Sequence, residues 1–227
     1  MRALTLVASL TFAAATVACI GSGDANLLEN ASFEDGGDPW FSLDSETWGE
    51  PFTVSDQQAK HGDSSALLEL RSATEPGPER IYGAVQDVTT ETFPDVLSGS
   101  YYVERWQRGT ELQYLQAVVI VEGAANAPAG IDASNHQVRY VLTGAGDPPL
   151  ELGNARYVIA GERDPEVGMW VDFEFAVSED FQRLWGVVPE GFESLRVLFE
   201  VRWDGRVEAE LPARADVYYD DLYLGSR

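Results

Sequence analysis

The feature that most constrains the fold of this chain is a two-residue alternation of apolar and polar side chains. It is clearest over residues 195–203, where apolar residues such as Val197 and Phe199 alternate with Arg196, Glu200 and Arg202. Because successive side chains of a strand point to opposite faces, the pattern predicts a strand with one face in a core. A sheet with one apolar face must bury that face against another layer of structure.

Eight other segments show short apolar runs of this kind, separated by clusters of Gly, Pro, Asn and Asp that predict turns. Nine or ten short strands with almost no helical periodicity predict an all-β protein with two packed sheets. The segments are residues 65–70, 81–88, 100–108, 112–121, 137–142, 155–160, 169–177, 195–203 and 217–224.

One segment departs from the strand pattern. Phe181, Leu184 and Trp185 fall at helical spacing, which predicts one helical turn over residues 180–185, capped by Ser178 and plugging one end of the sandwich. Residues 74–79, 123–133 and 144–153 carry glycine and proline and are expected to form surface loops, where binding residues are often displayed.

The N-terminal residues have the pattern of an export signal. Met1 and Arg2 precede an apolar stretch over residues 3–18, which is shorter than the ~20 residues of a membrane-spanning helix. Residues 1–18 are therefore predicted to be a signal peptide. Residues 19–25 are predicted to be a flexible tether, and residues 26–227 form a single domain because no composition shift or repeat divides them.

The segment Thr16-Val17-Ala18-Cys19 contains the only cysteine of the chain. It resembles a bacterial lipoprotein lipobox, which implies that Cys19 becomes the lipidated first residue of an envelope protein anchored in a membrane. An unpaired thiol in an exported protein agrees with this reading. The alternative is ordinary cleavage near Ala18, which would leave the protein secreted.

Charge excludes several kinds of partner. The chain has 38 acidic and 15 basic residues and a formal net charge of -23. Nucleic acids and anionic membrane surfaces require a cationic patch, so neither is an expected partner, and any membrane contact is through the lipid alone. We expect a monomer.

The residues offer little material for catalysis. With two histidines and one cysteine the chain has no set for a Cys-His pair or a multi-histidine zinc site. A Gly-x-Ser-x-Gly elbow is also absent. Among 38 acids some pair will satisfy any spacing for glycoside hydrolysis, so spacing alone carries no signal. We expect a protein that is not an enzyme.

Four separated segments share one family's pattern: residues 26–36 (NLLENASFEDG), 61–67 (HGDSSAL), 86–88 with 99–103, and 217–224 (VYYDDLYL). Together they resemble a carbohydrate-binding module of the CenC-like type, over residues 26–225. The resemblance implies a galactose-binding-domain-like jelly-roll β-sandwich whose first and last strands are neighbours.

The resemblance also implies a structural calcium ion between the chain ends. Its implied ligands are Glu34, backbone oxygens in the loop from Lys60 to Ser64, and Asp220. Calcium accepts such a mixture of carboxylate and carbonyl oxygens, and a cation would offset the repulsion between the two acids. The alternative is that Glu34 and Asp220 cap turns by accepting backbone N–H groups.

Sugar recognition in this family uses aromatic rings and polar side chains. Trp40 and Trp170 are expected in the core, whereas Trp48 is the ring most expected to be exposed. Burying Glu104 unpartnered would cost several kcal/mol, which favours the register that turns Tyr102, Glu104 and Trp106 outward. Partial burial at a sandwich edge is the alternative for each aromatic residue. The predicted ligand-binding residues are Trp48, Gln86, Tyr102, Glu104, Trp106, Tyr114, Gln116 and Arg202.

The sequence therefore leaves two possible functions. The first is non-catalytic binding of a polysaccharide or other glycan at the bacterial cell envelope. The second is a structural or protein-interaction β-sandwich lipoprotein without sugar binding, because one fold serves both uses.

Overall fold

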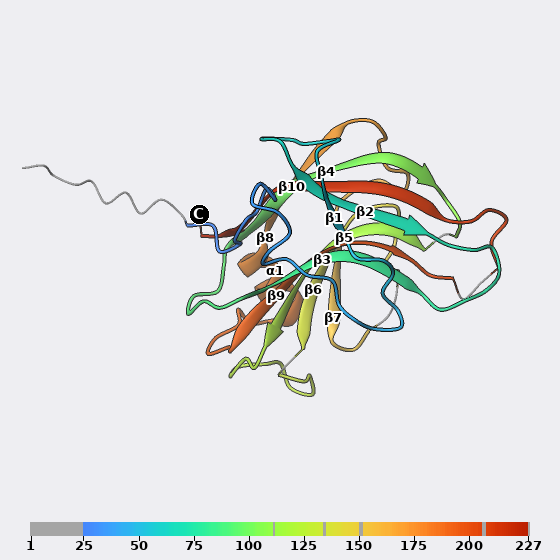
Figure 1. The fold of residues 1–227 in the computed structure, drawn as a ribbon. Coiled ribbons are helices and arrows are strands. Elements are labelled where there is room, and N and C mark those ends of the chain that lie inside the picture. The colour runs from blue at the N-terminus through green and yellow to red at the C-terminus, as the bar shows by residue number, and fades with distance from the viewer. Residues whose placement is uncertain (1–24, 111, 134, 150–151, 206–207, 227) are drawn as a thin grey trace, which may run out of the picture.

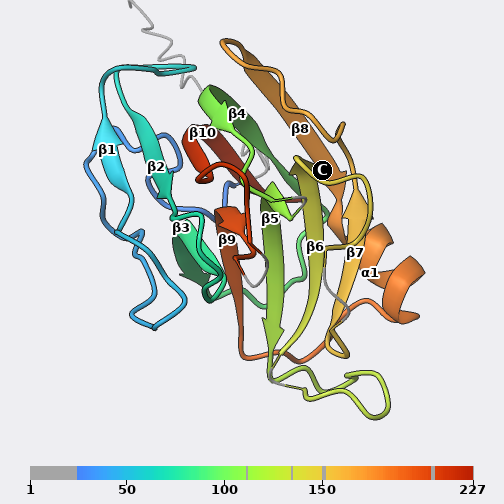
Figure 2. The ribbon, with the colours of Figure 1, turned by 90° about the vertical axis from the view of Figure 1, so that its right-hand side faces the viewer.

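The computed structural model describes residues 25–110, 112–133, 135–149, 152–205 and 208–226. The predicted signal peptide, Cys19 and most of the predicted tether lie outside these residues. Two five-stranded sheets pack face to face, with one helix beside them (Figures 1 and 2). The elements are β1 Thr53–Ser55, β2 Ser65–Arg71, β3 Arg80–Val88, β4 Val96–Gln107, β5 Gln113–Glu122, β6 His136–Thr143, β7 Ala155–Ile159, β8 Trp170–Ala176, α1 Val177–Trp185, β9 Ser194–Trp203 and β10 Arg214–Gly225.

The strand order defines the topology. One sheet has the order β1-β2-β10-β4-β8, here called the β1–β8 sheet, and the other has the order β3-β9-β5-β6-β7, here called the β3–β7 sheet. Neighbours are antiparallel except β6 and β7. The chain crosses between the sheets at each step from β2 to β5 and again at each step from β7 to β10. This is the double-sheet jelly roll, and the predicted all-β jelly-roll sandwich is confirmed.

The core lies between the sheets, as the alternation predicts. Leu195, Val197, Phe199 and Val201 of β9 are all fully buried and face inward. They join one large apolar cluster with side chains of the opposite sheet, including Leu97. Burial of one apolar face per strand is therefore the main source of stability.

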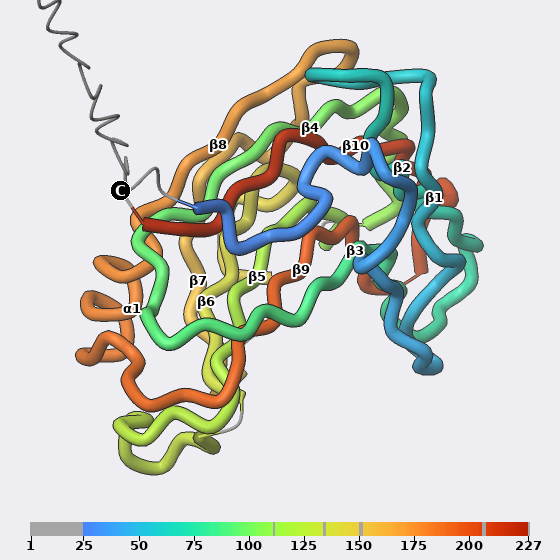
Figure 3. Tube along the Cα trace, turned by 60° about the vertical axis from the view of Figure 1, so that its left-hand side comes forward, coloured from blue at the N-terminus to red at the C-terminus, as the bar shows by residue number. Residues whose placement is uncertain are grey.

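The two ends of the domain lie side by side. The Leu27 N–H donates to the Leu224 carbonyl at 2.7 Å, and the Leu222 N–H donates to the Ala31 carbonyl at 3.1 Å. Figure 3 shows the N-terminal segment in blue along the end of β10 in red. The chain ends therefore meet, but the prediction that the first and last strands are neighbours is wrong, because β2 lies between β1 and β10 in the described sheet.

The helix begins earlier than the spacing predicts. α1 continues directly from β8, and Ala176 caps it without a side-chain hydrogen bond. Ser178 lies inside the helix and donates to Asp95 Oδ1 at 3.0 Å, so the predicted Ser178 cap is wrong. Phe181 and Trp185 are buried and close one end of the sandwich, as expected. Among the described residues no helix is long and apolar enough to cross a membrane.

Candidate functional site

The outward face of the β3–β7 sheet carries a set of polar side chains that are nearly inaccessible to solvent. In the pairing of β5 with β9, Tyr114 lies opposite Arg202, and Gln116 lies opposite Glu200. All four side chains are buried, although they point away from the core between the sheets. We call these four residues the polar floor. Burying polar and charged groups is costly unless they are paired, so their presence on an outward face requires an explanation.

Hydrogen bonds connect most of the polar floor but leave one acceptor unused. Gln116 Nε2 donates to the Glu200 carboxylate. An Arg202 amino group donates to Glu79 Oε2 at 2.7 Å, and another lies 3.8 Å from Glu200 Oε2. Gln116 Oε1 is buried and has no partner among the described residues.

The orientation of the Gln116 amide follows from its neighbour. A carboxylate only accepts hydrogen bonds, so the nitrogen of the amide must face Glu200 and the oxygen must be the unused atom. An unpaired buried acceptor costs about 1–3 kcal/mol, which a hydroxyl group donating to Gln116 Oε1 would recover.

Aromatic side chains border the polar floor. Trp48 is half-buried, and its ring lies over Gly83: a Cβ atom at Gly83 would meet Trp48 Cη2 and Glu200 Cγ, each at 3.1 Å. On the far side, Tyr157 of β7 lies opposite Arg139 of β6, and both are half-buried. A ring at each border gives the floor flat apolar walls.

The pKa values show that these groups share one poorly hydrated environment. Burial raises the pKa of Tyr157, and the positive charges of Arg139 and Arg202 act against it. Burial likewise raises the pKa of Tyr114, again opposed by Arg202 and Arg139. Perturbed groups that cluster outside the core mark a candidate functional site.

Part of the polar floor lies beneath a loop. Tyr114 and Arg202 line a nearly filled space together with Leu112 and Pro149. Gln116 and Glu200, next to Trp48, are buried as well, so a ligand would reach them only after the side chains that cover them move aside. At the other two positions of the polar floor, Tyr114 and Arg202, the loop closes the outward side.

The structure separates the predicted ligand-binding residues into two groups. Trp48, Tyr114, Gln116 and Arg202 belong to the β3–β7 sheet or its border, as described above. Tyr102 and Glu104 point outward from β4 as predicted, but β4 belongs to the other sheet. The predicted ligand-binding residues therefore do not share one face of the molecule.

Trp106 faces inward, contrary to the expectation. Val103 pairs with Val217, but Arg105 pairs with Asp216, so a β-bulge inserts one residue into β4. The extra residue reverses the alternation, and Trp106 packs against the main core while Arg105 stays exposed.

Two other expectations also change. Gln86 is buried, and its amide exchanges hydrogen bonds with the backbone of Glu29, with distances of 2.8 and 3.0 Å, so it anchors the N-terminal segment. Trp40 is in the core as expected. Trp170 was expected there too, but it is half-buried on the outward face of β8.

The implied calcium ligands lie together, but backbone N–H groups face the two carboxylates. Glu34 Oε1 accepts from the N–H groups of Asp63 and Ser64, both at 2.9 Å. Asp220 Oδ2 accepts from those of Lys60 at 2.6 Å and His61 at 3.1 Å. Burial raises the pKa of Asp220, and these N–H groups act against the rise.

Calcium requires six to eight oxygen ligands, whereas the loop offers N–H donors to these acids. In this arrangement the residues do not form the oxygen cage of a calcium ion, and they match the turn-capping alternative. No group of three or more acidic, histidine or cysteine side chains in the described residues is placed to hold a metal. Calcium binding stays a prediction.

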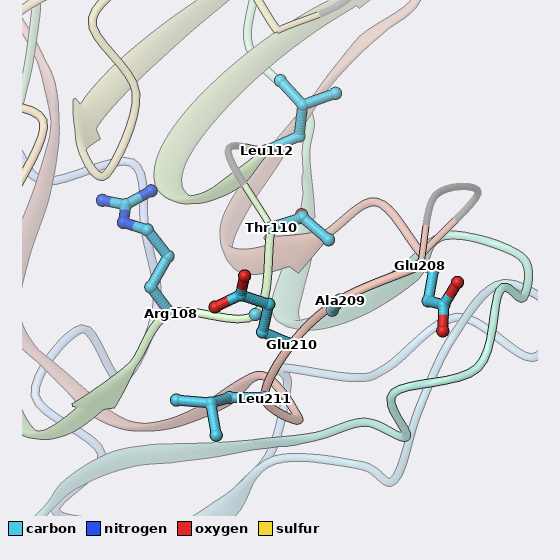
Figure 4. A pocket seen from close by; sticks show the side chains of 8 residues that line it. Arg108, Thr110, Leu112, Glu208, Ala209, Glu210 and Leu211 are labelled. Atoms are coloured by element: carbon cyan, nitrogen blue, oxygen red, sulfur yellow. The ribbon is translucent and has the colours of Figure 1, made fainter.

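A separate hollow of about 540 Å³ lies at one end of the sandwich, where Arg108 and Glu208 stand on opposite sides (Figure 4). The Arg108 guanidinium donates to the Gly144 carbonyl at 3.0 Å and contacts Asp164 at 3.2 Å. Its walls include Leu112 and Leu211. With its arginine engaged elsewhere, this hollow lacks the converging polar groups of the β3–β7 face.

No family model and no curated protein matches the sequence. Solved structures resemble the chain at low sequence identity. TmCBM61 in complex with β-1,4-galactotriose shows 13% identity and a TM-score of 0.46, over 88% of this chain and 97% of that one. The CBM22-1 xylan-binding domain of Paenibacillus barcinonensis Xyn10C shows 14% identity and a TM-score of 0.44, over 90% and 97%.

A third neighbour is the enzymatically active domain of tailspike protein 4 from bacteriophage CBA120. It shows 10% identity and a TM-score of 0.43, over 88% of this chain and 21% of that one. What these proteins bind or cleave is a property of those proteins. The function of this chain is therefore argued from its own residues.

Proposed function

We propose that this protein binds a glycan without catalysis, through the outward face of the β3–β7 sheet. The observation that carries the proposal is the buried, unpartnered Oε1 of Gln116 beside the Glu200 carboxylate. A sugar hydroxyl can donate to one of these oxygens while its neighbouring hydroxyl donates to the other. Trp48, at the border, supplies a ring for the apolar face of the sugar.

The dimensions of the face favour an oligosaccharide over a single sugar. The row Gly83, Glu200, Gln116 and Val141 continues to Ile159, so it crosses five strands. Four spacings of about 4.8 Å give a length of roughly 19 Å from the Trp48 border to the Tyr157 border. A short oligosaccharide is long enough to meet both rings, and to lie along this row it must displace the side chains that cover Gln116 and Val141.

The charge of the protein favours a glycan without acidic groups. The formal net charge of -23 repels polyuronates and sulfated polymers at low salt. Arg202 is engaged by Glu79 and Glu200, which reduces its capacity to attract an anion. The same contacts hold Glu200 as a fixed hydrogen-bonding group.

The experiment is a binding assay of residues 26–227 with β-1,4-galactotriose, soluble xylan and polygalacturonate. We expect binding to at least one of the first two and none to polygalacturonate. Gln116→Leu keeps the approximate shape of the side chain and should weaken that binding at least tenfold, as should Trp48→Ala. Met169→Ala, at an exposed position just before β8 of the other sheet, is the control.

If Gln116→Leu binds the glycan as well as the unaltered protein does, and its melting curve shows that it is folded, the proposed binding site is wrong. The rival is a structural or protein-interaction domain, which the filled space beneath Pro149 favours. Absence of binding to all tested glycans would support that rival.

The cellular setting is also part of the proposal. A signal peptide over residues 1–18 and a lipid on Cys19 would anchor the domain in the envelope. In a bacterial host, the full chain should partition into the detergent phase, and Cys19→Ala should move it to the aqueous phase. Aqueous partition of the unaltered chain would leave cleavage near Ala18 as the explanation.

A structural calcium ion remains the predicted cofactor. If it binds, millimolar calcium should raise the melting temperature, and Asp220→Ala should abolish that rise. An unchanged melting temperature of the unaltered protein would assign Glu34 and Asp220 to turn capping alone.

A further inference from the structure

The outward face of the β1–β8 sheet carries an aromatic pair that the site above does not use. Tyr102 of β4 lies opposite Trp170 of β8, with ring centroids 5.6 Å apart and planes at 50°. Both rings are half-buried. The pair therefore offers partly exposed ring surface near the β8 edge of an open sheet face.

A buried tyrosine fixes this aromatic pair from the side. Tyr218 of β10 lies opposite Tyr102, with ring centroids 6.0 Å apart at 75°. Its hydroxyl donates to Glu104 Oε2 at 3.1 Å, and Glu104 is the next outward residue after Tyr102 along β4. The ring and the carboxylate are thus held in one arrangement before any ligand arrives, which lowers the entropy cost of binding.

A hollow of about 400 Å³ lies further along β4 and β8, beside Ser100, Asp172 and the loop that contains Lys60. Asp172 lies two residues from Trp170, and its Oδ1 accepts from Lys60 Nζ at 2.7 Å and from Ser100 Oγ at 2.6 Å. These two hydrogen bonds lower the pKa of Asp172, which keeps it charged. The Asp172 side chain is still 71% exposed, so it can accept further hydrogen bonds.

A second hollow of about 510 Å³ lies on the other side, next to Tyr218 and Glu104. Its polar side chains are held by ion pairs: Arg71 contacts Glu69 at 2.7 Å and also Asp216, and Arg105 contacts Asp216 at 3.4 Å. Fixed carboxylates and guanidinium groups of this kind suit adjacent hydroxyls, because each presents two parallel hydrogen-bonding positions.

We propose that this face is a second saccharide site, in which the pair stacks against one sugar ring and the two hollows bind the hydroxyls of its neighbours. The ligand is an uncharged oligosaccharide, a class that rests on the proposed function. Acids outnumber bases in both hollows: three carboxylates line the first beside Lys60 and His61, and four line the second beside Arg71 and Arg105. That excess disfavours anionic glycans.

The two sites lie on opposite outer faces, separated by both sheets and the core. One domain can therefore hold two polysaccharide strands at once. Bivalency of this kind raises the apparent affinity for a polymer without any new contact at either site.

The test measures stoichiometry and cross-linking with the protein of residues 26–227. Calorimetry uses β-1,4-galactotriose and short xylan oligosaccharides, and turbidity uses soluble xylan. We expect two sites per chain for the unaltered protein and one for Trp170→Ala. Gln116→Leu should also leave one site, and the double variant none. Either single variant should lose the turbidity that the unaltered protein causes.

Controls separate this proposal from the first one. Trp170→Phe keeps an aromatic ring and should retain two sites, whereas Met169→Ala tests for a general disturbance of the β8 edge. One site per chain that survives Trp170→Ala would overturn the second site and leave the first. One site that Trp170→Ala removes and Gln116→Leu leaves intact would overturn the first and keep the second. Absence of any binding to these probes would count against both.

Discussion

The two outward faces of this sandwich are built from strands of the same kind, yet they hold their polar groups in opposite ways. On the β3–β7 face, Gln116, Glu200 and Arg202 are buried beneath loops and neighbouring side chains. On the β1–β8 face, charged side chains such as Asp172 and Arg105 remain largely exposed. The β3–β7 face of the jelly roll thus has a few strong polar contacts, whereas the β1–β8 face has many weak ones.

The difference arises outside the strands. The segment that contains Phe41 and Trp48 runs along the free edge of β3, with the Phe41 and Val85 backbones paired and Trp48 beside Ile81. Phe41 and Trp48 then cover part of the outward β3–β7 face. In a poorly hydrated site each hydrogen bond is stronger than it would be in water. An unpaired polar group there also costs more free energy.

The largest expected effect comes from breaking a buried charge contact. Arg202→Met would leave Glu200 and Glu79 without their cation and should lower the free energy of unfolding by about 3–5 kcal/mol. Arg105→Ala on the open face should cost about 0–1 kcal/mol. Urea unfolding of both variants measures the contrast, and equal losses would show that the two faces do not differ in this way.

A smaller effect is expected from a methyl group beneath Trp48. In Gly83→Ala the new Cβ would lie 3.0 Å from the Phe199 carbonyl oxygen and 3.1 Å from Trp48 Cη2. Overpacking of this kind costs about 1–3 kcal/mol and should displace the ring, which a shift in tryptophan fluorescence would report. Gly146→Ala is the matched control, because nothing lies within 4 Å of its Cβ. Identical spectra for the two variants would contradict the described Trp48 position.

Acidification should affect the interior before either face. His136 is fully buried between Phe181 and Trp185, and burial lowers its pKa. Neither of its ring nitrogens has a hydrogen-bond partner within the part of the chain that the structure describes. In the unfolded chain its pKa is about 6.5, so the unfolded state binds more protons below that value. Stability should therefore fall as the pH drops from about 6.5 towards the lower pKa of the folded state.

The slope can reach at most about 1.4 kcal/mol per pH unit, because one proton is involved. Thermal melts of His136→Phe between pH 7 and pH 5 should lack this component, whereas His61→Gln, at an exposed position, should retain it. Retention of the full slope by His136→Phe would assign the pH dependence to other groups.

The smallest effect is expected on the open face. Lys60→Met removes the ion pair with the exposed Asp172 and should cost about 0.2–1 kcal/mol, less at high salt. Unfolding at low and high salt measures it. A loss as large as that of Arg202→Met would erase the distinction between the two faces.

Much of the candidate site could be predicted from the sequence. The alternation in residues 195–203 and 112–121 correctly turned Arg202, Glu200 and Gln116 away from the core. The same alternation in residues 137–142 also turns Arg139 outward, although Arg139 is not among the predicted ligand-binding residues. Tyr157 gave a weaker signal, because its short strand is half-buried along its whole length.

Other positions depended on contacts that no local pattern contains. Trp106 turned inward because one extra residue in β4 reversed the alternation, and the only local trace was Arg105 where an apolar residue was expected. For Trp170, by contrast, the local pattern was informative, because Val171, Phe173 and Phe175 pack against the core and turn Trp170 outward. The loop that covers Tyr114 was predicted as a loop, but its path over the polar floor was not.

The sequence by itself determined the all-β class, the strands and the direction of most side chains, because period-two alternation acts between residues close together in the chain. It also indicated that the two chain ends meet, through the resemblance of its first and last segments. Only the tertiary structure decided which strands share a sheet, and therefore that Tyr102 and Gln116 face opposite sides of the molecule. Sheet membership depends on pairing between distant strands, and the burial of the polar floor depends on loops that cross it.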